Sequence, residues 1–426
     1  MTPPAPPLIL REWQILEVGA GALSRRSADR LHAIAERAAR RLGLPETGVL
    51  TRTVRGLKAG QVVGVISAPG LTLEILPKIG GDKGAERLAL VRMLAVAWDL
   101  RIAEGELAAL HTQPHDLLEL LIRLFAERLY ALVRRGLPRR YRAHEEDLAR
   151  LRGKLDVKRQ FTRLAVRPDR LACRFDQLSE DTPLNRVFKA VVFRLAGVAR
   201  SVSSTRRLAE LSARFDRVAD SVDPLREPVR LDRTNTAFHD VYRLARLFLE
   251  GDWQTTSVGG VPGFSLLFPM NELFEMYIGR CLKRALASRP VHLQHRGRFS
   301  LRTADDAGLF ALVPDVVVGE PTVGPIILDT KWKLLTPRAP RCNRTLGVAQ
   351  SDVYQMLAYA RAYGATRVVL VYPWHDELDE GQSRSWQISG QEDCVLEIAT
   401  VNVGRPDTVE HTLHGIVGPT VQPPSA

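Results

Sequence analysis

The sequence predicts a multidomain protein of the α/β (α+β) class, with a β-rich N-terminal domain, a mainly helical middle region and a C-terminal domain that alternates helices and strands. Its 426 residues exceed the length that one hydrophobic core usually organises. A hydrophobic fraction of 45% and a charged fraction of 25% are ordinary values for globular domains. The apolar residues follow a strand pattern near the start, a helix pattern in the middle and both patterns in the last third. We therefore expect domains at residues 1–82, 83–255 and 256–414, followed by a flexible tail at 415–426.

The N-terminal domain is predicted from short apolar runs. Residues 8–18 have the pattern of one strand, and residues 27–42 carry apolar side chains at helical spacing. Two further apolar runs, at residues 62–66 and 71–76, are joined by a short segment that contains proline and glycine, which is a turn signal. These runs make the first domain β-rich.

The middle region is predicted to be mainly helical. Leucines at helical spacing mark residues 117–135, and Gly136 and Pro138 follow them as a stop signal. Further helices are expected downstream, at residues 184–199, 207–215 and 239–249. Residues 251–263 are rich in glycine, serine and threonine, so we take them as the boundary to the last domain.

The densest basic segment of the chain spans residues 134–163. The formal net charge of the whole chain is +12, and a basic surface attracts polyanions, of which nucleic acid is the commonest. The alternative explanation of the positive net charge is a genome whose base composition favours arginine over lysine. The segment therefore has three open interpretations: it contacts DNA, the acidic face of a partner, or only water. For DNA, the candidate contacts are basic residues of this segment and one lysine near the C-terminal motif: Arg139, Arg140, Arg142, Arg152, Lys154 and Lys333.

Nothing in the sequence points to a membrane or to export. The first residues lack the basic and apolar regions of a signal peptide, and no apolar stretch approaches the roughly 20 residues that span a bilayer. The four cysteines lie far apart, without the spacing of a zinc or iron–sulfur site. We expect a cytoplasmic protein with reduced thiols.

The C-terminal domain carries the residues that point to chemistry. Asp315 follows Pro314 at the start of one apolar strand, and the next apolar strand contains Asp329 and Lys331. The last two residues share a face of their strand because they are two positions apart. Two carboxylates can hold Mg²⁺, which polarises a phosphate and lowers the pKa of a bound water, and an ammonium group beside them can stabilise the charge that develops. This set predicts phosphodiester hydrolysis; the alternative is a solvated ion pair on an edge strand.

Two helices add further candidates. In the helix predicted at residues 270–285, Glu275 lies at the margin of the apolar face, whereas Glu272 points further toward solvent. Glu275 is therefore the candidate for an extra metal or water ligand. In a second helix downstream, Gln355 and Tyr359 are neighbours one turn apart and can hydrogen-bond a phosphate or the catalytic lysine. The alternatives are a surface glutamate and ordinary helix packing.

These motifs resemble those of PD-(D/E)XK nucleases, and in particular those of McrC, the nuclease subunit of the McrBC modification-dependent restriction system. The resemblance covers roughly residues 55–375 and rests on three patterns in order: Pro314-Asp315, Asp329-x-Lys331 and Gln355-x-x-x-Tyr359. The neighbouring residues also resemble that family, as in Met270-Asn-Glu-Leu-Phe-Glu275 and Leu328-Asp-Thr-Lys-Trp-Lys333.

The resemblance implies a central mixed sheet flanked by helices, with Asp315, Asp329 and Lys331 as catalytic residues and Mg²⁺ as cofactor. It further implies cleavage of methylcytosine-containing DNA together with a hexameric AAA+ GTPase, McrB, whose GTP hydrolysis this family stimulates through its N-terminal part. The position held by Asp329 is more often Glu in the family. The chain has no G-x-x-x-x-G-K-[ST] loop, so we expect it to bind no nucleotide itself.

Three alternatives stay open beside a restriction subunit. A stand-alone RecB-like repair nuclease would need no motor, but the N-terminal half resembles McrC. A catalytically silent adaptor would activate a motor without cutting DNA. A DNA-binding module without catalytic activity would leave the carboxylates on neighbouring strands unexplained.

Overall fold

The computed structural model describes residues 7–19, 23–79, 83–102, 105, 117–250, 263–336, 345–378 and 383–418. Contacts divide the chain into two compact units, one of Met1–Leu117 with Gln254–Ala426 and the other of Leu118–Trp253. The chain thus leaves the first unit once and later returns to it. The domain boundary expected at residue 256 falls outside the described residues. No helix in the described ranges combines the length and apolar composition needed to cross a bilayer.

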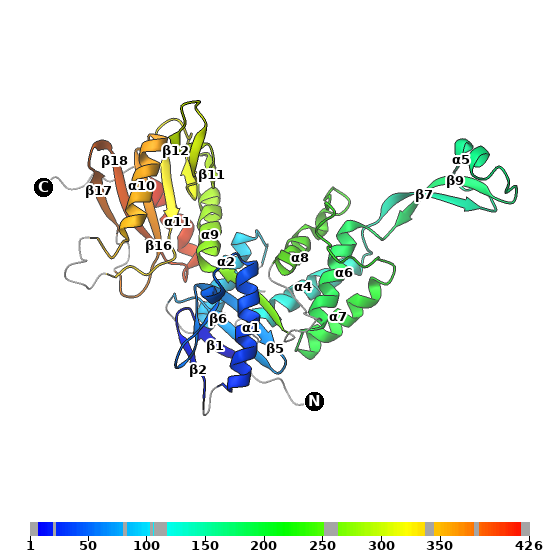
Figure 1. The fold of residues 1–426 in the computed structure, drawn as a ribbon, viewed down its shortest axis with the longest axis horizontal. Helices are drawn as coiled ribbons and strands as arrows, with labels where there is room; N and C mark the ends of the chain where they lie inside the picture. The colour runs from blue at the N-terminus through cyan, green and yellow to red at the C-terminus, as the bar shows by residue number, and fades with distance from the viewer. Residues whose placement is uncertain are drawn as a thin grey trace. The chain divides into compact units, whose positions relative to one another are not determined.

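The first unit begins with two small sheets (Figure 1). The larger has the strand order β1 (Leu8–Arg11), β6 (Leu71–Leu76), β5 (Val62–Ala68), β10 (Phe264–Pro269). The smaller has the order β2 (Ile15–Glu17), β4 (Gly56–Ala59), β3 (Leu50–Arg52). Helix α1 (Arg25–Arg41) packs on both, and the side chain of Ser24 caps it by accepting a hydrogen bond from the backbone N–H of Ser27. Apolar side chains of the helix and the sheets form one core.

Residues 8–18 form two strands in different sheets, so the expectation of a single strand was wrong. β1 runs parallel to β6, whereas β2 runs antiparallel to β4. Between the two strands Trp13 has a φ of +66°, a left-handed conformation that redirects the chain. Tryptophan is not among the usual turn residues, so the sequence pattern did not reveal this turn.

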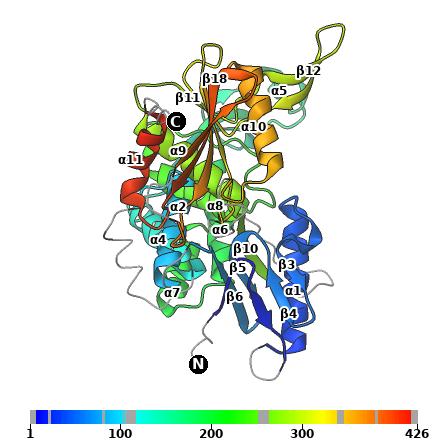
Figure 2. The ribbon, with the colours of Figure 1, turned by 90° about the vertical axis from the view of Figure 1, so that its left-hand side faces the viewer.

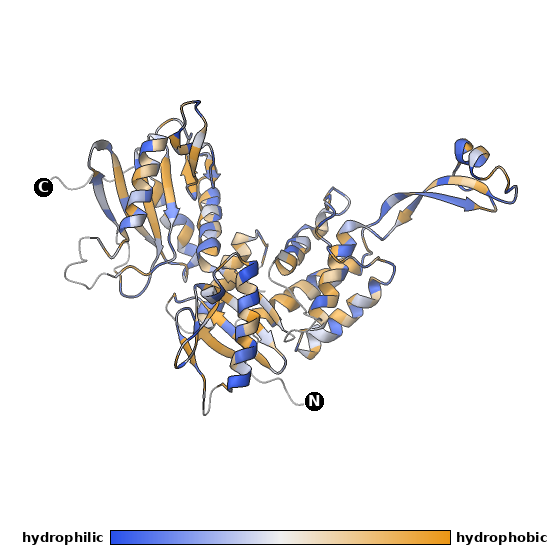
Figure 3. Cartoon of the chain, viewed as in Figure 1, coloured by the Kyte–Doolittle hydropathy of each residue, from blue (hydrophilic) through white to orange (hydrophobic). Residues whose placement is uncertain are grey.

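A six-stranded mixed sheet forms the centre of the C-terminal part. Its order is β11 (Val291–Leu293), β14 (Val316–Val318), β15 (Ile326–Thr330), β16 (Arg367–Pro373), β18 (Gln391–Val401), β17 (Arg384–Ile388). β14 and β15 are antiparallel, whereas β15, β16 and β18 are parallel. β16 is buried along its whole length, and Figure 3 shows how apolar these central strands are.

Helices cover both faces of this sheet (Figure 2). α10 (Gln350–Tyr363) lies on one face, and α9 (Met270–Ala285) and α11 (Pro406–Val417) lie on the other. Helix α2 (Lys83–Ala97) packs against α9. Since α11 continues to Val417, the chain is still helical at residue 415, where we expected the tail to begin; residues 419–426 lie outside the described part.

The second unit combines helices with a long two-stranded arm, visible in Figure 1. Its main helices are α4 (Leu117–Val133), α6 (Pro183–Ala196), α7 (Val202–Arg214) and α8 (His239–Glu250). In the arm, β7 (Arg140–Leu148) pairs antiparallel with β9 (Leu171–Ser179). The short strand β8 (Lys154–Leu155) and helix α5 (Val157–Thr162) lie between them in the sequence.

The arm departs from the mainly helical character predicted for the middle region. Strand β7 carries few alternating apolar residues, which are the usual signal of a strand, although β9 has Leu171, Cys173 and Phe175 at alternate positions. Charge pairs lie across the ladder. Glu145 lies opposite Arg174, and the guanidinium and carboxylate are 2.8 Å apart. Opposite charges on facing positions stabilise a two-stranded ladder of which only Ala172, Cys173 and Phe175 of β9 are buried.

A buried contact joins the N-terminal sheets to the chain directly after β15. Nε1 of Trp332 donates to both carboxylate oxygens of Glu12, at 3.1 and 2.9 Å, and Nε2 of Gln61 donates to the backbone carbonyl of Trp332 at 2.6 Å. The indole also packs against Phe274 of α9, with 5.1 Å between ring centroids. Glu12 is 1% exposed, and this burial raises its pKa to about 7 against the opposing hydrogen bond from Trp332.

Replacing Glu12 with Gln should change how the stability of the protein depends on pH. Because the pKa of Glu12 is raised from 4.5 to about 7 in the folded state, its ionisation costs stability as the pH rises between these values. Glu12→Gln removes this loss, so the free energy of unfolding of the variant relative to the parent should rise by up to about 3 kcal/mol from pH 4.5 to pH 8. Urea unfolding at several pH values measures the difference. The exposed Glu17→Gln is the control, and a difference between E12Q and the parent that stays constant with pH would contradict the expectation.

Gly64 is required where β5 meets β10. Its φ is +128°, and an added Cβ would lie 2.0 Å from the carbonyl oxygen of Leu266. Gly64→Ala should therefore lower the free energy of unfolding by at least about 2 kcal/mol, because the energetic cost of the strained backbone adds to the cost of pushing β5 and β10 apart. Gly415→Ala in α11, where a Cβ would meet nothing within 4 Å, is the matched control and should not destabilise. Equal denaturation midpoints for the two variants would refute the role of Gly64.

Candidate active site

The candidate catalytic aspartates face each other across two neighbouring strands. Asp315 directly precedes β14, and Asp329 lies near the end of β15. The register pairs Val316 with Leu328, so the next position brings Asp315 opposite Asp329. Facing side chains of an antiparallel pair lie within reach of one another. The spacing seen in the sequence thus becomes one cluster at the end of the two strands.

Asp329 is 1% exposed, and its charge has one close partner. Oδ2 of Asp329 lies 2.5 Å from Nζ of Lys331 in an ion pair, although no group in the described structure donates it a well-directed hydrogen bond. Burial raises the pKa of Asp329 to about 6, and the neighbouring Asp315 carboxyl adds to this rise while Lys331 opposes it. The carboxyl is therefore held in an environment that disfavours its negative charge.

Asp315 is held by the strand that carries Asp329. Its Oδ2 accepts hydrogen bonds from the backbone N–H of Thr330 at 2.7 Å and from Oγ1 of Thr330 at 2.6 Å. Burial nevertheless raises the pKa of Asp315, because desolvation outweighs these two hydrogen bonds and the attraction of Lys331. Both hydrogen bonds use Oδ2, and Oδ1 accepts none from the residues that the structure describes.

Lys331 is oriented by a chain of hydrogen bonds from α10. Nζ of Lys331 donates to Oε1 of Gln355 at 3.0 Å, and Nε2 of Gln355 donates to the Tyr359 hydroxyl at 2.9 Å. The hydroxyl in turn donates to the backbone carbonyl of Val313 at 3.1 Å, two residues before Asp315. The two helix residues singled out in the sequence therefore lie at the site and fix the direction of the ammonium group.

Glu275 on α9 also faces the aspartates. Its Oε1 accepts a hydrogen bond from Nε2 of Gln294 at 2.8 Å. Burial raises the pKa of Glu275 to about 7, and the nearby carboxyl of Asp315, followed more weakly by that of Asp329, adds to the shift. Glu272 is exposed, in keeping with the direction that the helical geometry gave it.

Thr330 and Gln294 belong to the site but were missed in the sequence. Strand alternation predicts that the side chain of Thr330 points away from those of Asp329 and Lys331, yet its hydroxyl donates a hydrogen bond to Asp315. Gln294 has a φ of +45°, and its backbone N–H donates to the carbonyl of Asp315 at 2.8 Å. This residue follows a strand of three residues and belongs to no motif, so no sequence signal marked it.

The carboxyl groups form a partial ligand set for a divalent cation. In the part of the chain that the structure describes, no three His, Cys, Asp or Glu side chains are grouped closely enough to bind a metal on their own. Mg²⁺, however, is usually held by one or two carboxylates together with water and substrate phosphate. Asp315 and Asp329 meet this need, since Asp329 is buried and Asp315 half-buried, the two carboxyls repel each other, and Lys331 is the close partner described for Oδ2 of Asp329. The residues present therefore fit Mg²⁺.

The predicted DNA contacts of the basic segment are partly engaged within the second unit. Arginines 139, 140 and 142 form ion pairs with carboxylates of the same unit: Arg139 with Glu180, Arg140 with Asp232 and Arg142 with Asp181. Arg152 lies over the ring of Phe175, and Lys154 is exposed. In the first unit, Nζ of Lys333 lies 2.9 Å from Oδ2 of Asp352. DNA binding by these six residues stays a prediction.

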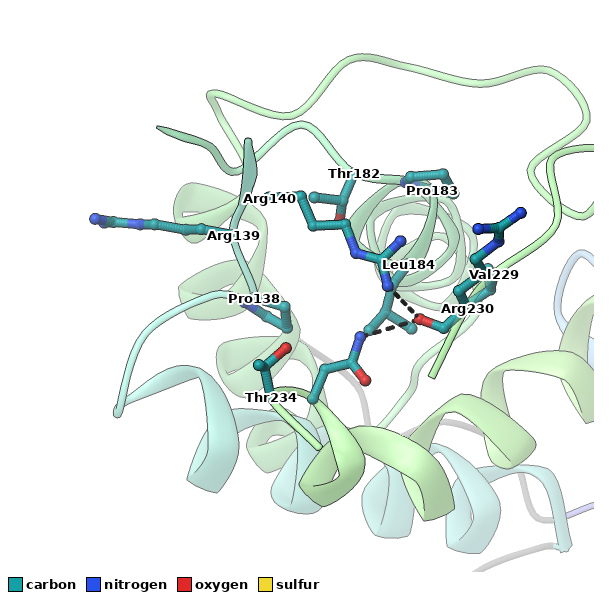
Figure 4. Close-up of a pocket in the computed structure, with 10 residues that line it drawn as sticks. Pro138, Arg139, Arg140, Thr182, Pro183, Leu184, Val229, Arg230 and Thr234 are labelled. Atoms are coloured by element: carbon teal, nitrogen blue, oxygen red, sulfur yellow. Dashed lines mark hydrogen bonds between the residues drawn. The ribbon is translucent and has the colours of Figure 1, made fainter. Parts of the chain in front are cut away.

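Arg139 and Arg140 also line a small cavity (Figure 4). Nη2 of Arg140 donates to the backbone carbonyl of Arg230 at 2.8 Å, and Nδ2 of Asn235 donates to the same carbonyl at 3.2 Å. The cavity holds only about 10 Å³, roughly the room for one water. These contacts hold the loop around Arg230 in place rather than offer a ligand site.

Comparisons with known proteins identify the family of the chain and solved structures of similar fold. The family model described as McrBC 5-methylcytosine restriction system component matches residues 57–373. One chain of similar fold comes from a half-complex of a tetradecameric assembly of Thermococcus gammatolerans McrB AAA+ hexamers with bound McrC. It has 23% identity and a TM-score of 0.71, and the match covers 96% of this chain and 100% of that one.

A second similar chain comes from the Thermococcus gammatolerans McrBC complex, with 28% identity and a TM-score of 0.54 over 66% of this chain and 88% of that one. Among curated proteins the comparison finds no match. The family model spans most of the chain, including Asp315, Asp329 and Lys331. The chain therefore belongs to the family of McrBC 5-methylcytosine restriction system components, as its motifs indicated.

Proposed function

We propose that the chain is the nuclease subunit of a McrBC-like type IV restriction complex, a Mg²⁺-dependent endodeoxyribonuclease of the PD-(D/E)XK type that cleaves methylcytosine-containing DNA. The observation that carries the proposal is the pairing of the buried Asp329 with the half-buried Asp315 at facing strand positions beside Lys331. Holding two carboxyl groups at facing positions away from water costs stability, a cost that a bound cation would offset and that is typical of functional sites. Membership of the McrBC family supports the same activity.

The described residues divide the chemistry among them. Asp315 and Asp329 would hold Mg²⁺, which when bound polarises the scissile phosphate and lowers the pKa of a water. The Lys331 ammonium, directed by Gln355, would stabilise the negative charge that develops on the phosphate. Glu275 has a pKa of about 7, which suits a group that takes a proton from the attacking water. Its Oε2 is the atom for this step, because Oε1 accepts from Gln294.

We further propose a McrB-like AAA+ GTPase hexamer as the cytoplasmic partner that this chain stimulates. Two solved structures with similar folds contain such hexamers or the McrBC complex, and this chain has no phosphate-binding loop of its own. The N-terminal domain remains the predicted contact. The arm of the second unit adds exposed apolar side chains that suit a protein surface: Tyr141, Phe161 and Val166 are 75%, 74% and 88% exposed.

Asp329→Asn and Lys331→Gln should each abolish cleavage without unfolding the protein. We expect cleavage of methylated DNA, measured with the GTPase partner, GTP and Mg²⁺, to fall by at least about 100-fold. Asp329→Asn weakens a ligand of Mg²⁺, and Lys331→Gln removes a positive charge beside the phosphate. Stimulation of the partner's GTP hydrolysis should persist. The exposed Asp29→Asn on α1 is the matched control and should cleave normally. Full cleavage by either site variant would overturn the assignment.

The same assay separates the alternatives. Cleavage by the chain alone, independent of GTP and of methylation, would favour a repair nuclease of the RecB type. Stimulated GTP hydrolysis with no cleavage by the unaltered protein would favour a silent adaptor.

Mg²⁺ should raise the thermal stability of the protein itself, in the absence of DNA. A cation between Asp315 and Asp329 would relieve their repulsion in the folded state only, so Tm should rise with MgCl₂ concentration. Asp329→Asn should be at least as stable as the parent without Mg²⁺, because a buried charge is removed, and it should lose most of the Mg²⁺-dependent rise. Equal Mg²⁺ dependence in D329N, D29N and the parent would show that these residues do not bind the metal.

A further inference from the structure

Residues 294–298 run along the candidate active site and are tied to it at both ends. At one end Gln294 donates to Glu275 through its side chain and to the carbonyl of Asp315 through its backbone. At the other end Arg298 begins β12 (Arg298–Arg302), where it pairs with Leu312 of β13 (Gly308–Leu312), three residues before Asp315. The segment is thus anchored to the elements that carry the candidate catalytic carboxyls.

Contacts with α10 fix the middle of the segment. Nδ1 of His295 and the hydroxyl of Tyr363 are 3.0 Å apart, and the guanidinium of Arg298 lies 5.8 Å from the centre of the Tyr363 ring. Tyr363 stands one helical turn after Tyr359, which belongs to the hydrogen-bond chain of Lys331. Left-handed backbone at Gln294 (φ +45°) and Gly297 (φ +139°) gives the segment a course that an ordinary strand or helix does not take.

Two cations of this segment have no carboxylate partner in the structure as described. Arg296 is exposed and Arg298 is half-buried, and neither forms an ion pair with a described acidic residue. Arg302, further along the same strand, is by contrast paired with Asp306 at 2.7 Å. The positive field of Arg298 also contributes to lowering the pKa of His295, after burial and His292. An arginine without an acidic partner beside a phosphate-cleaving site is suited to bind a neighbouring phosphate.

We propose that Arg296 and Arg298 form a phosphate-binding edge of the active site, which holds the DNA backbone next to the phosphate that is cut. The inference rests on the proposed nuclease function and adds to it two residues that bind the substrate backbone. Neither of them lies in the basic segment 134–163. Contacts of this kind position the duplex without reading its sequence. They also make binding depend on salt, since each occupied phosphate releases counterions.

The test is binding of a fluorescent duplex DNA to the full-length chain in an Asp329→Asn background, which permits binding without cleavage. Arg296→Ala/Arg298→Ala should raise Kd about tenfold, and the slope of log Kd against log salt concentration should fall by about 0.9 for each phosphate that the protein no longer binds. Arg25→Ala/Arg26→Ala on α1 removes the same charge from an exposed part of the same unit and should leave both quantities nearly unchanged. The conservative pair Arg296→Lys/Arg298→Lys should restore most of the salt dependence.

Two results would overturn the inference. One is an R296A/R298A protein that is folded by circular dichroism and shows the Kd and salt slope of the R25A/R26A control. The other is a loss of binding confined to Lys154→Ala/Lys158→Ala, which would place the DNA contact on the arm. In the otherwise unaltered complex, R296A/R298A should raise KM for cleavage more than it lowers kcat. If the parent complex does not cleave DNA but binding still depends on Arg296 and Arg298, the proposed nuclease function fails while the phosphate contact of these two arginines stands.

Discussion

The candidate active site depends on three carboxyl groups and one ammonium group held close together, of which the Asp329 carboxyl is fully buried and the others are half-buried. Asp315 raises the pKa of both Asp329 and Glu275, and Lys331 offsets part of the repulsion among the carboxyls. Such a cluster persists only when its surroundings are rigid, because each group would otherwise turn toward water. The rigidity comes from antiparallel pairing of β14 with β15, from the Gln355–Tyr359 chain on α10 and from the contact of Trp332 with Glu12 in the N-terminal part. The N-terminal sheets therefore support the site as well as their own core.

Local periodicity was enough to predict most of this site. Asp329 and Lys331 share a face because strand side chains alternate, and Gln355 and Tyr359 are neighbours because they are one helical turn apart. Gln294 could not be predicted, since its place depends on a left-handed backbone and on partners distant in sequence. The metal, the DNA and the roles of the individual residues remain inferences from the chemistry of the cluster.

The fold was predictable where apolar residues form continuous runs and was not predictable where charged residues interrupt them. The mixed C-terminal sheet with its helices and the strands β5 and β6 follow strong apolar runs. The arm does not follow such runs, because charged residues such as Glu145 and Arg174 occupy facing positions of its two strands. The turn at Trp13 was missed for a related reason, since a left-handed tryptophan depends on its surroundings and not on an intrinsic preference.

The late return of the chain to its first sheet has a consequence for biosynthesis. β5 pairs on one side with β6, but its other neighbour is β10, which follows about 200 residues later. While the ribosome makes the second unit, one edge of β5 has no partner, and an apolar edge is where chains misassociate. At Gly64 this edge is approached so closely by β10 that an added Cβ would clash with the carbonyl oxygen of Leu266. β10 leads directly into the helix that bears Glu275, so the strand that closes this sheet is continuous with an element of the candidate site, and a nascent chain that stops short of β10 lacks Glu275, Asp315, Asp329 and Lys331.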